Sequence, residues 1–196
     1  MADEQSSRQG NDAPLATSKE KDAVAQARSA LVDGKGSAIT ARAVTINKPV
    51  DEVFAYFRDF ARLPTFMENV ERIDVLDDKR THWVVKAPAG RTVEWDARIT
   101  EEVPGRLIAW TSEDGADVPN SGRVEFRDAG QRGTVVSATI LYDPPGGMIG
   151  KVIAKMFQRD PAIQARRDLR RFKQLLETGE IATSAMNEKQ LEETGR

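Results

Sequence analysis

The chain has 196 residues, 31% of them charged, a formal net charge of -2 and no cysteine. This length favours one domain with tails, and the near-balanced charge gives no global attraction to nucleic acid or anionic membranes. The absence of cysteine excludes disulfides, thiolate nucleophiles and metal–thiolate sites. No run approaches the roughly 20 apolar residues of a membrane span, and the polar N-terminus lacks an apolar signal region, so we expect a cytoplasmic protein.

Residues 1–36 are poor in aromatic side chains and rich in Ala, Ser, Gly, Asp and Lys. Such a segment buries too little apolar surface to offset the entropy of ordering, so we predict a flexible polar N-terminal segment. The glycines around Lys35 indicate a hinge into the domain. We place the domain at 37–180 and a flexible C-terminal tail at 181–196.

A first strand is predicted over 37–46, followed by two short helices. Asn47-Lys48-Pro49 opens the first helix, and Asp51 and Glu52 lie in its first turn, where the helix dipole favours anions. Its apolar residues have helical spacing: Val50, Val53, Phe54 and Phe57. A second helical segment at 60–67 is interrupted by Pro64 and is too apolar for a free loop.

Six further strands follow, and the short turns between them indicate antiparallel neighbours. We predict them at 70–76, 81–87, 91–103, 106–112, 121–127 and 134–142. Alternation assigns one face of the sheet to an apolar set: Trp83, Val85, Val93, Trp95, Ala97, Ile99, Ile108, Trp110, Val124, Phe126, Val136, Ala138, Ile140 and Tyr142. Side chains of this set are either ordinary core residues or the wall of a cavity, for which Ala97 and Ala138 would leave room.

A long helical pattern spans 146–179. Its first half carries Ile149, Val152, Ile153, Met156 and Phe157 at helical spacing, and its second half continues with Ala165, Leu169, Phe172 and Leu176. Asp160-Pro161 predicts a kink or a break with a fresh helix start, because Pro lacks a backbone N–H and Asp is a good N-cap. Gly179 is a C-terminal stop signal. This helix is the only element large enough to cover the apolar face of the sheet.

Three stretches of this sequence resemble the START-related, polyketide cyclase/dehydrase-like superfamily (SRPBCC): INKPVDEVFAYFRDFARLPTFMENVERIDVLD, WDARITEEVPGRLIAW and GTVVSATILYDPPGG. The resemblance covers about 38–179 and implies the α+β helix-grip fold. In that fold a seven-stranded curved antiparallel sheet wraps around a long C-terminal helix, with two short helices after the first strand. Members bind lipids, sterols, quinones, hormones or polyketides between sheet and helix; some are aromatases or cyclases, and others carry or sense their ligand.

The resemblance implies binding of a small hydrophobic ligand (lipid, quinone or polyketide-like), as a carrier or sensor without a cofactor. We expect the cavity to be lined by Phe57, Phe66, Met67, Trp83, Trp95, Trp110, Phe126, Ile140, Tyr142, Ile149, Ile153 and Phe157. Phe66 and Met67 would face the last three across the cavity mouth, as a gate or as a plug. The alternative is a cyclase/dehydrase-type enzyme; no catalytic signature is present, and Tyr142 is the candidate proton-transfer group or simply a wall residue.

Polar residues outside this set have plainer interpretations. His82 should point away from the covered face, and one His without Cys predicts no transition-metal site. Glu94, Asp96, Arg98 and Glu101 are expected to form cross-strand pairs with Arg123, Glu125 and Arg127. Basic residues on the last helix predict a solvated face with helix ion pairs to Asp168 and Glu177: Arg166, Arg167, Arg170, Arg171 and Lys173. A third hypothesis is that this basic face and the tails dock another protein or a membrane. We expect no binding of nucleic acid and no stable membrane association. The sequence leaves the oligomeric state open.

Overall fold

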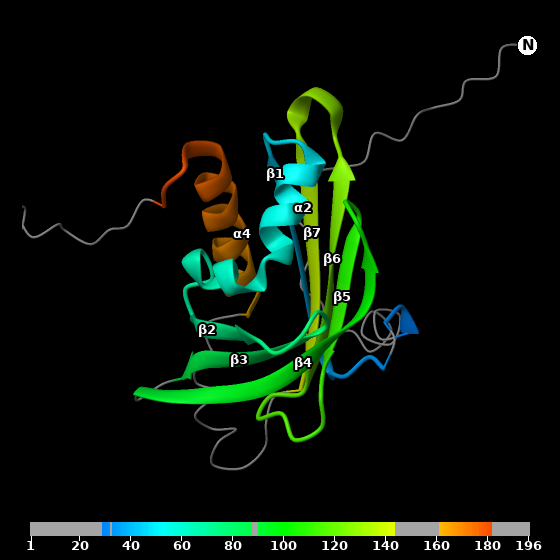
Figure 1. The fold of residues 1–196 in the computed structure, drawn as a ribbon, viewed down its shortest axis with the longest axis vertical. Coiled ribbons are helices and arrows are strands. Elements are labelled where there is room, and N and C mark those ends of the chain that lie inside the picture. The colour runs from blue at the N-terminus through cyan, green and yellow to red at the C-terminus, as the bar shows by residue number, and fades with distance from the viewer. Residues whose placement is uncertain (1–28, 32, 88–89, 144–160, 182–196) are drawn as a thin grey trace, which may run out of the picture.

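The computed structural model describes residues 29–31, 33–87, 90–143 and 161–181. Seven antiparallel strands form one sheet in the order β1-β7-β6-β5-β4-β3-β2 (Figure 1). The strands are β1 (Ala38–Ile46), β2 (Val70–Val75), β3 (Arg80–Ala87), β4 (Arg91–Val103), β5 (Leu107–Ser112), β6 (Asn120–Asp128) and β7 (Thr134–Tyr142). The helical elements are α2 (Val50–Arg58), η1 (Phe60–Thr65), η3 (Gly130–Arg132) and α4 (Pro161–Thr178). The predicted helix-grip architecture is confirmed.

The sheet is strongly curved, and both α2 and α4 lie on its concave side (Figure 1). The pairing register shifts between Ile99 and Glu101 in β4 and between Val70 and Arg72 in β2. Such bulges bend a strand and increase its local twist. The curvature therefore gives the concave face the shape of a trough, which α4 covers from one side.

The strand order corrects one prediction about the charged face. We expected Glu94, Asp96 and Arg98 to pair across strands with basic and acidic residues of β6. This is wrong, because β5 lies between β4 and β6. The partners lie elsewhere: Arg123 pairs with Glu125 of its own strand at 2.9 Å, Asp96 contacts His82 of β3 at 2.7 Å, and Arg98 pairs with Asp33 ahead of β1.

Helix α2 anchors the core at one end of the trough. Its residues Val53, Phe54 and Phe57 are buried, as their helical spacing predicts. Both phenyl rings pack edge to face on Phe126 of β6, with centroids 5.3 and 5.7 Å away. Aromatic pairs in this geometry add about 0.5–1.5 kcal/mol beyond the burial of area. These contacts fix α2 on the sheet next to α4.

Helix α4 buries the predicted stripe of Leu169, Phe172 and Leu176. It ends where predicted, because Gly179 has a φ of 82° and its amide donates to the Leu175 carbonyl at 2.9 Å. Residues 146–160, which hold the predicted first half of the long helix and Asp160 of the predicted break, lie outside the described residues.

The basic face of α4 divides into two groups. Arg166, Arg167 and Arg170 are exposed. Arg171 Nε, by contrast, donates to the Phe66 carbonyl at 3.0 Å, and Lys173 Nζ donates to the Thr45 carbonyl at 2.7 Å. Two of the five predicted solvated cations therefore tie α4 to the domain.

Residues just before β1 pack on the convex face of the sheet. Leu31 is buried against Ala109 and Leu141. Lys35 and Ser121 exchange two hydrogen bonds, from the Lys35 amide to Oγ at 2.9 Å and from Oγ to the Lys35 carbonyl at 2.7 Å. These residues belong to the segment that the sequence placed ahead of the domain, so the described part of that segment extends the fold as a strap over β5 and β6.

Candidate functional site: a cavity between the sheet and helix α4

A cavity of about 250 Å³ lies between the concave face of the sheet and the elements that cover it. Its helical side is formed by α2, η1 and α4, through residues such as Phe57, Leu63 and Leu169. Its sheet side is formed by residues of all seven strands, and most of the lining is apolar. This volume lies just below the roughly 300–1,000 Å³ of pockets that take drug-sized ligands.

All three tryptophans of the chain line this cavity. Trp83 and Trp95 are directly opposite on β3 and β4, and their rings stack with centroids 6.1 Å apart and planes 6° apart. The indole N–H of Trp83 donates to Thr81 Oγ1 at 2.9 Å, and that of Trp110 donates to Asn120 Oδ1 at 3.2 Å. Because the indole N–H groups of Trp83 and Trp110 are satisfied within the wall, these two rings present apolar surface to the cavity.

Small residues on the sheet create the space. Ala97 and Ala138 line the cavity, as alternation indicated. Gly122 lies opposite Trp110 across β5 and β6. A Cβ atom at position 122 would stand 2.5 Å from Trp110 Cζ2, so only glycine lets the indole lie flat against β6. The position of the Trp110 wall therefore depends on Gly122.

The structure brings eight of the twelve predicted site residues together around the cavity: Phe57, Phe66, Met67, Trp83, Trp95, Trp110, Ile140 and Tyr142. Phe126 is buried in the core against Phe54 and Phe57 and is not part of the lining. Ile149, Ile153 and Phe157 lie outside the described residues, and with them the predicted contact across the cavity mouth.

Asp168 is a cavity residue that the sequence analysis missed. It was interpreted as a partner of the basic side chains on the surface of α4. The signal was present, because Asp168 lies three residues after Ala165 and four before Phe172, which places it on the apolar face of the helix. Its Oδ1 accepts hydrogen bonds from Gln164 Nε2 at 2.9 Å and from the Glu68 amide at 3.3 Å.

Burial raises the pKa of Asp168 to about 7. The two hydrogen bonds and the positive charge of Arg171 lower the pKa, and the nearby Glu68 carboxylate raises it, but desolvation is the largest effect. A carboxyl group that takes up and releases a proton near neutral pH is thus part of a mostly apolar wall.

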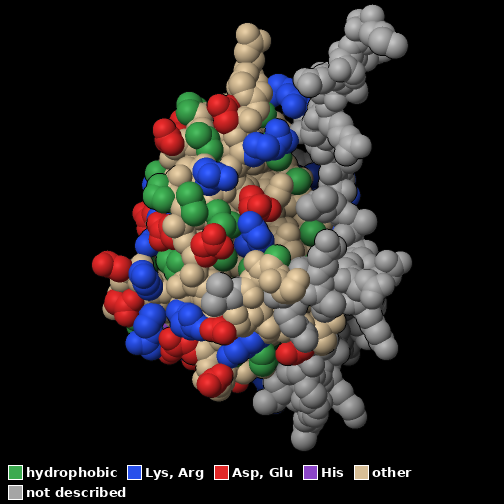
Figure 2. All heavy atoms as spheres, turned by 90° about the vertical axis from the view of Figure 1, so that its right-hand side faces the viewer, with side chains coloured by type: hydrophobic (Ala, Val, Ile, Leu, Met, Phe, Trp, Pro, Cys, Tyr) green, Lys and Arg blue, Asp and Glu red, His purple; other side chains and the backbone are tan. Residues whose placement is uncertain are grey.

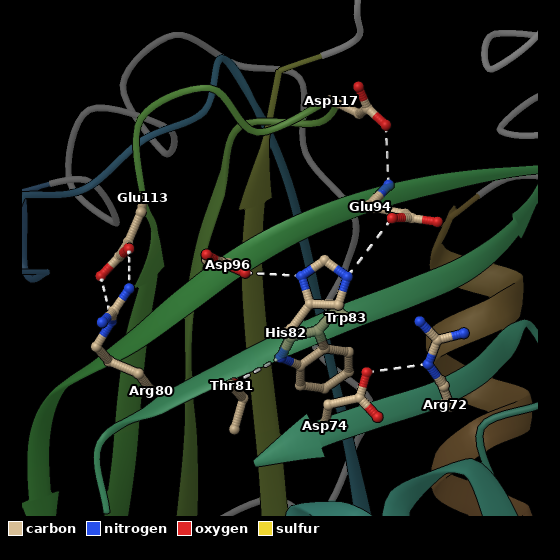
Figure 3. Close-up of polar contacts among 10 residues, drawn as sticks. All are labelled: Arg72, Asp74, Arg80, Thr81, His82, Trp83, Glu94, Asp96, Glu113 and Asp117. Carbon is tan, nitrogen blue, oxygen red and sulfur yellow. Dashed lines mark hydrogen bonds and ion pairs between the residues drawn. The ribbon is translucent and has the colours of Figure 1, made fainter. Parts of the chain in front are cut away.

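His82 lies on the convex face, away from the cavity, as predicted. Its Nδ1 is 2.7 Å from Asp96 Oδ1 and its Nε2 is 3.5 Å from Glu94 Oε2. Figure 3 shows this cluster, with Trp83, the next residue of β3, bonded to Thr81. Since neighbouring residues of a strand point to opposite faces, His82 cannot reach a molecule that Trp83 contacts in the cavity.

Residues 46–170 match the family model described as polyketide cyclase / dehydrase and lipid transport. The chain belongs to this family. The matched region runs from the end of β1 into α4 and so includes most of the residues that form the cavity. The family's fold is one that binds hydrophobic ligands.

Individual relatives agree with this assignment. An uncharacterised 17.2 kDa protein of Streptomyces lincolnensis is 33% identical over 135 residues, which are 68% of this chain and 86% of the relative. A crystal structure from Deinococcus radiodurans is 40% identical, with a TM-score of 0.59 over 73% of this chain and 99% of its own. The di-domain ARO/CYC StfQ from the steffimycin biosynthetic pathway has the same fold at 17% identity, with a TM-score of 0.53 over 71% of this chain and 50% of its own.

A second hollow in this polyketide cyclase / dehydrase family member lies on the convex face, beside the strap before β1. It is lined by charged and polar side chains, among them Asp33, Lys35, Arg98 and Asp114. These charges neutralise one another, because Lys35 pairs with Asp114 at 3.0 Å and Arg98 pairs with Asp33. Exposed pairs of this kind contribute little to stability, and the hollow lacks the apolar wall of the concave side.

The described part of the chain contains no group of three or more His, Cys, Asp or Glu residues placed to hold a metal ion. No helix within the described ranges is long and apolar enough to cross a membrane. Basic and acidic side chains are interspersed on the flank of the molecule shown in Figure 2. This pattern matches the near-balanced charge of the sequence and offers no broad single-sign surface on that flank.

Proposed function

We propose that this protein binds a small hydrophobic ligand (a lipid, a quinone or a polyketide-like molecule) between the sheet and α4, and acts as a carrier or sensor. The main support for this proposal is the cavity of about 250 Å³, whose lining includes all three tryptophans. Apolar burial would supply the affinity, at about 25 cal/mol per Å² before the costs of association. The residues proposed to contact the ligand are the eight predicted residues that line the cavity, with Asp168 and Gln164 added.

The size of the cavity restricts the ligand. A cavity of about 250 Å³ lies at the small end for ligand pockets, so it suits a compact molecule better than a long lipid. The stacked pair of Trp83 and Trp95 adds aromatic surface to the lining. An aromatic or quinone-like ligand therefore has rings to pack against.

The proposal is tested by a panel of fatty acids, quinones and aromatic polyketides. Because every tryptophan lines the cavity, a ligand that enters it should change the tryptophan emission and also raise the melting temperature. A panel in which no compound changes either signal would remove the main support for a carrier or sensor.

A second candidate function is a cyclase/dehydrase-type enzyme that folds a flexible substrate in the same cavity. It is favoured by two groups of the lining that can exchange a proton, the Tyr142 phenol and the Asp168 carboxyl, whose pKa is about 7. StfQ, which shares the fold, is an ARO/CYC protein of a biosynthetic pathway. Because one fold can host different functions, cyclase activity in this protein has to be tested directly. Tyr142→Phe should abolish turnover of a polyketide-like substrate while its binding persists; unchanged turnover would remove Tyr142 from the mechanism.

A further inference from the structure

At the end of the cavity formed by α4 and the loop after η1, the lining contains several polar residues. Gln164 and Asp168 of α4 line the cavity, and Asn69 lines it beside Glu68, whose amide bonds to Asp168. The polar residues of the sheet wall are used differently. Thr81 and Asn120 accept hydrogen bonds from the indole N–H groups of Trp83 and Trp110.

Asp168 is held in place by bonds that leave one of its oxygens for another role. Among the described residues, both hydrogen bonds to the carboxyl group end on Oδ1, one from Gln164 and one from the Glu68 amide. The same turn of α4 is tied to the loop again by the bond from Arg171 Nε to the Phe66 carbonyl. The carboxyl group is therefore preorganised, and Oδ2 is the oxygen with which it can bind a molecule in the cavity.

Burial, and not the neighbouring charges, favours an uncharged Asp168 carboxyl group below neutral pH. Desolvation raises its pKa to about 7, and Glu68 adds to this effect, whereas Arg171 opposes it. The other ionisable residues of the described lining are Arg98, which pairs with Asp33 on the convex side, and Tyr142. A protonated carboxyl group donates a hydrogen bond, and the neighbouring Gln164 amide oxygen can accept one.

These observations define the polar part of the ligand. The two charges that act on Asp168, Arg171 and Glu68, have opposite signs and do not line the cavity, so neither a cationic nor an anionic head finds a matching charge in the described part of this apolar space, where unpaired charge is costly. A carbonyl oxygen fits better, because it accepts the hydrogen bond that a neutral Asp168 donates. A buried donor that gains a partner adds about 0.5–1.5 kcal/mol in favourable cases, which is about a 2- to 10-fold gain in affinity.

We propose that Asp168 is a specificity-determining residue of the ligand site, and that it selects small, uncharged, mostly apolar molecules that carry a carbonyl oxygen at one end. This inference rests on the proposed binding function and adds to it the orientation of the ligand: the oxygen at α4 and the apolar body between Trp83, Trp95 and Trp110.

Three matched probes test the inference: naphthalene, 2-acetylnaphthalene and 2-(aminomethyl)naphthalene. Affinities are obtained from NMR titrations of the three indole N–H signals at about pH 6 and about pH 8.5, on either side of the Asp168 pKa. We expect the ketone to bind about 2- to 10-fold more tightly than naphthalene at the lower pH. This advantage should disappear at the higher pH, where Asp168 no longer donates, while naphthalene binds equally at both.

Two variants assign the effect to Asp168. Asp168→Leu should lose the preference for the ketone at both pH values and keep naphthalene affinity. Asp168→Asn should keep the preference at both, because an amide donor does not titrate. Asp78→Asn, at an exposed position, should behave like the unmodified protein. Naphthalene affinity in each variant also reports whether the cavity is intact.

Each outcome bears on a different part of the account. Naphthalene binding without a pH-dependent preference for the ketone would overturn the role of Asp168 and leave the proposed function in place. Tighter binding of the ammonium probe at the higher pH would overturn it as well, because Asp168 would then act as an anion. Failure of all three probes to bind would contradict the proposed function and the inference together.

Discussion

The rings of Phe66 and Phe172 stack with centroids 4.5 Å apart and planes 24° apart. Phe66 directly follows η1 and Phe172 lies in the middle of α4, and both side chains are almost completely buried. Arg171 and Asp168 bond to the backbone of residues 66 and 68 from the same stretch of α4. The helix wall of the cavity is therefore fixed to the loop after η1 at three neighbouring points.

Loss of the Phe172 ring should destabilise the whole domain. We expect Phe172→Ala to lower the free energy of unfolding by about 3–5 kcal/mol, because the substitution removes buried area and leaves a void between α4, η1 and Phe57. Urea unfolding measures this change. Arg170→Ala, two residues away and exposed, should change stability by less than about 0.5 kcal/mol. Equal effects of the two substitutions would show that α4 does not pack as described.

Gly122→Ala should displace Trp110. The new methyl group would meet Trp110 Cζ2 at 2.5 Å and the Thr139 carbonyl oxygen at 2.8 Å, and the backbone oxygen cannot move out of the way. We expect a loss of about 1–3 kcal/mol in stability, a shifted Trp110 indole signal and weaker probe binding. Adding Trp110→Phe shortens the ring and should recover part of the stability. A Gly122→Ala protein with unchanged stability and spectrum would contradict this packing.

Asp168 should make the protein less stable as the pH rises. Its folded-state pKa of about 7 lies above the unfolded value near 4, so between these values only the folded state holds the proton. The contribution is fully present below about pH 4, falls through the interval and is lost above about pH 7. Relative to the unmodified protein, Asp168→Asn should therefore gain about 2–3 kcal/mol between pH 5 and pH 8, at 1.36 kcal/mol per pKa unit.

Urea unfolding of both proteins at the two pH values measures this gain. Asp78→Asn, the same substitution at an exposed position, serves as the matched control. If the difference between Asp168→Asn and the unmodified protein does not change with pH, Asp168 has an ordinary pKa and the polar end of the cavity is solvated.

Most of the fold could be predicted from the sequence because its strands alternate regularly. Val124 and Phe126, for example, fall on the buried side and Glu125 on the exposed side, as a period of two requires. Gly179 and the buried Phe172 likewise follow from local patterns on a helix. Local residue patterns are therefore enough to predict where these elements lie in the sequence.

Other features depend on residues that are far apart in the sequence. Leu31 is buried only because Ala109 and Leu141, on β5 and β7, form a surface for it, and composition around residue 31 carries no sign of that surface. Strand order likewise decides that Arg123 bonds to Glu125 and not to β4. Asp168 was missed for a different reason: because it is charged, it was assigned to the solvated surface of α4, although its spacing places it on the apolar face of the helix.

The central claim is that a small apolar molecule occupies the space between the sheet and α4. The most direct test is an NMR titration of the three indole N–H signals with 2-acetylnaphthalene, in the unmodified protein, in Ala138→Leu and in Ser137→Leu. Ala138 lines the cavity, whereas Ser137 points to the other face of the same strand. The account predicts saturable shifts in the unmodified protein and Ser137→Leu, and at least a 10-fold loss of affinity in a folded Ala138→Leu protein; equal affinities in all three would contradict it.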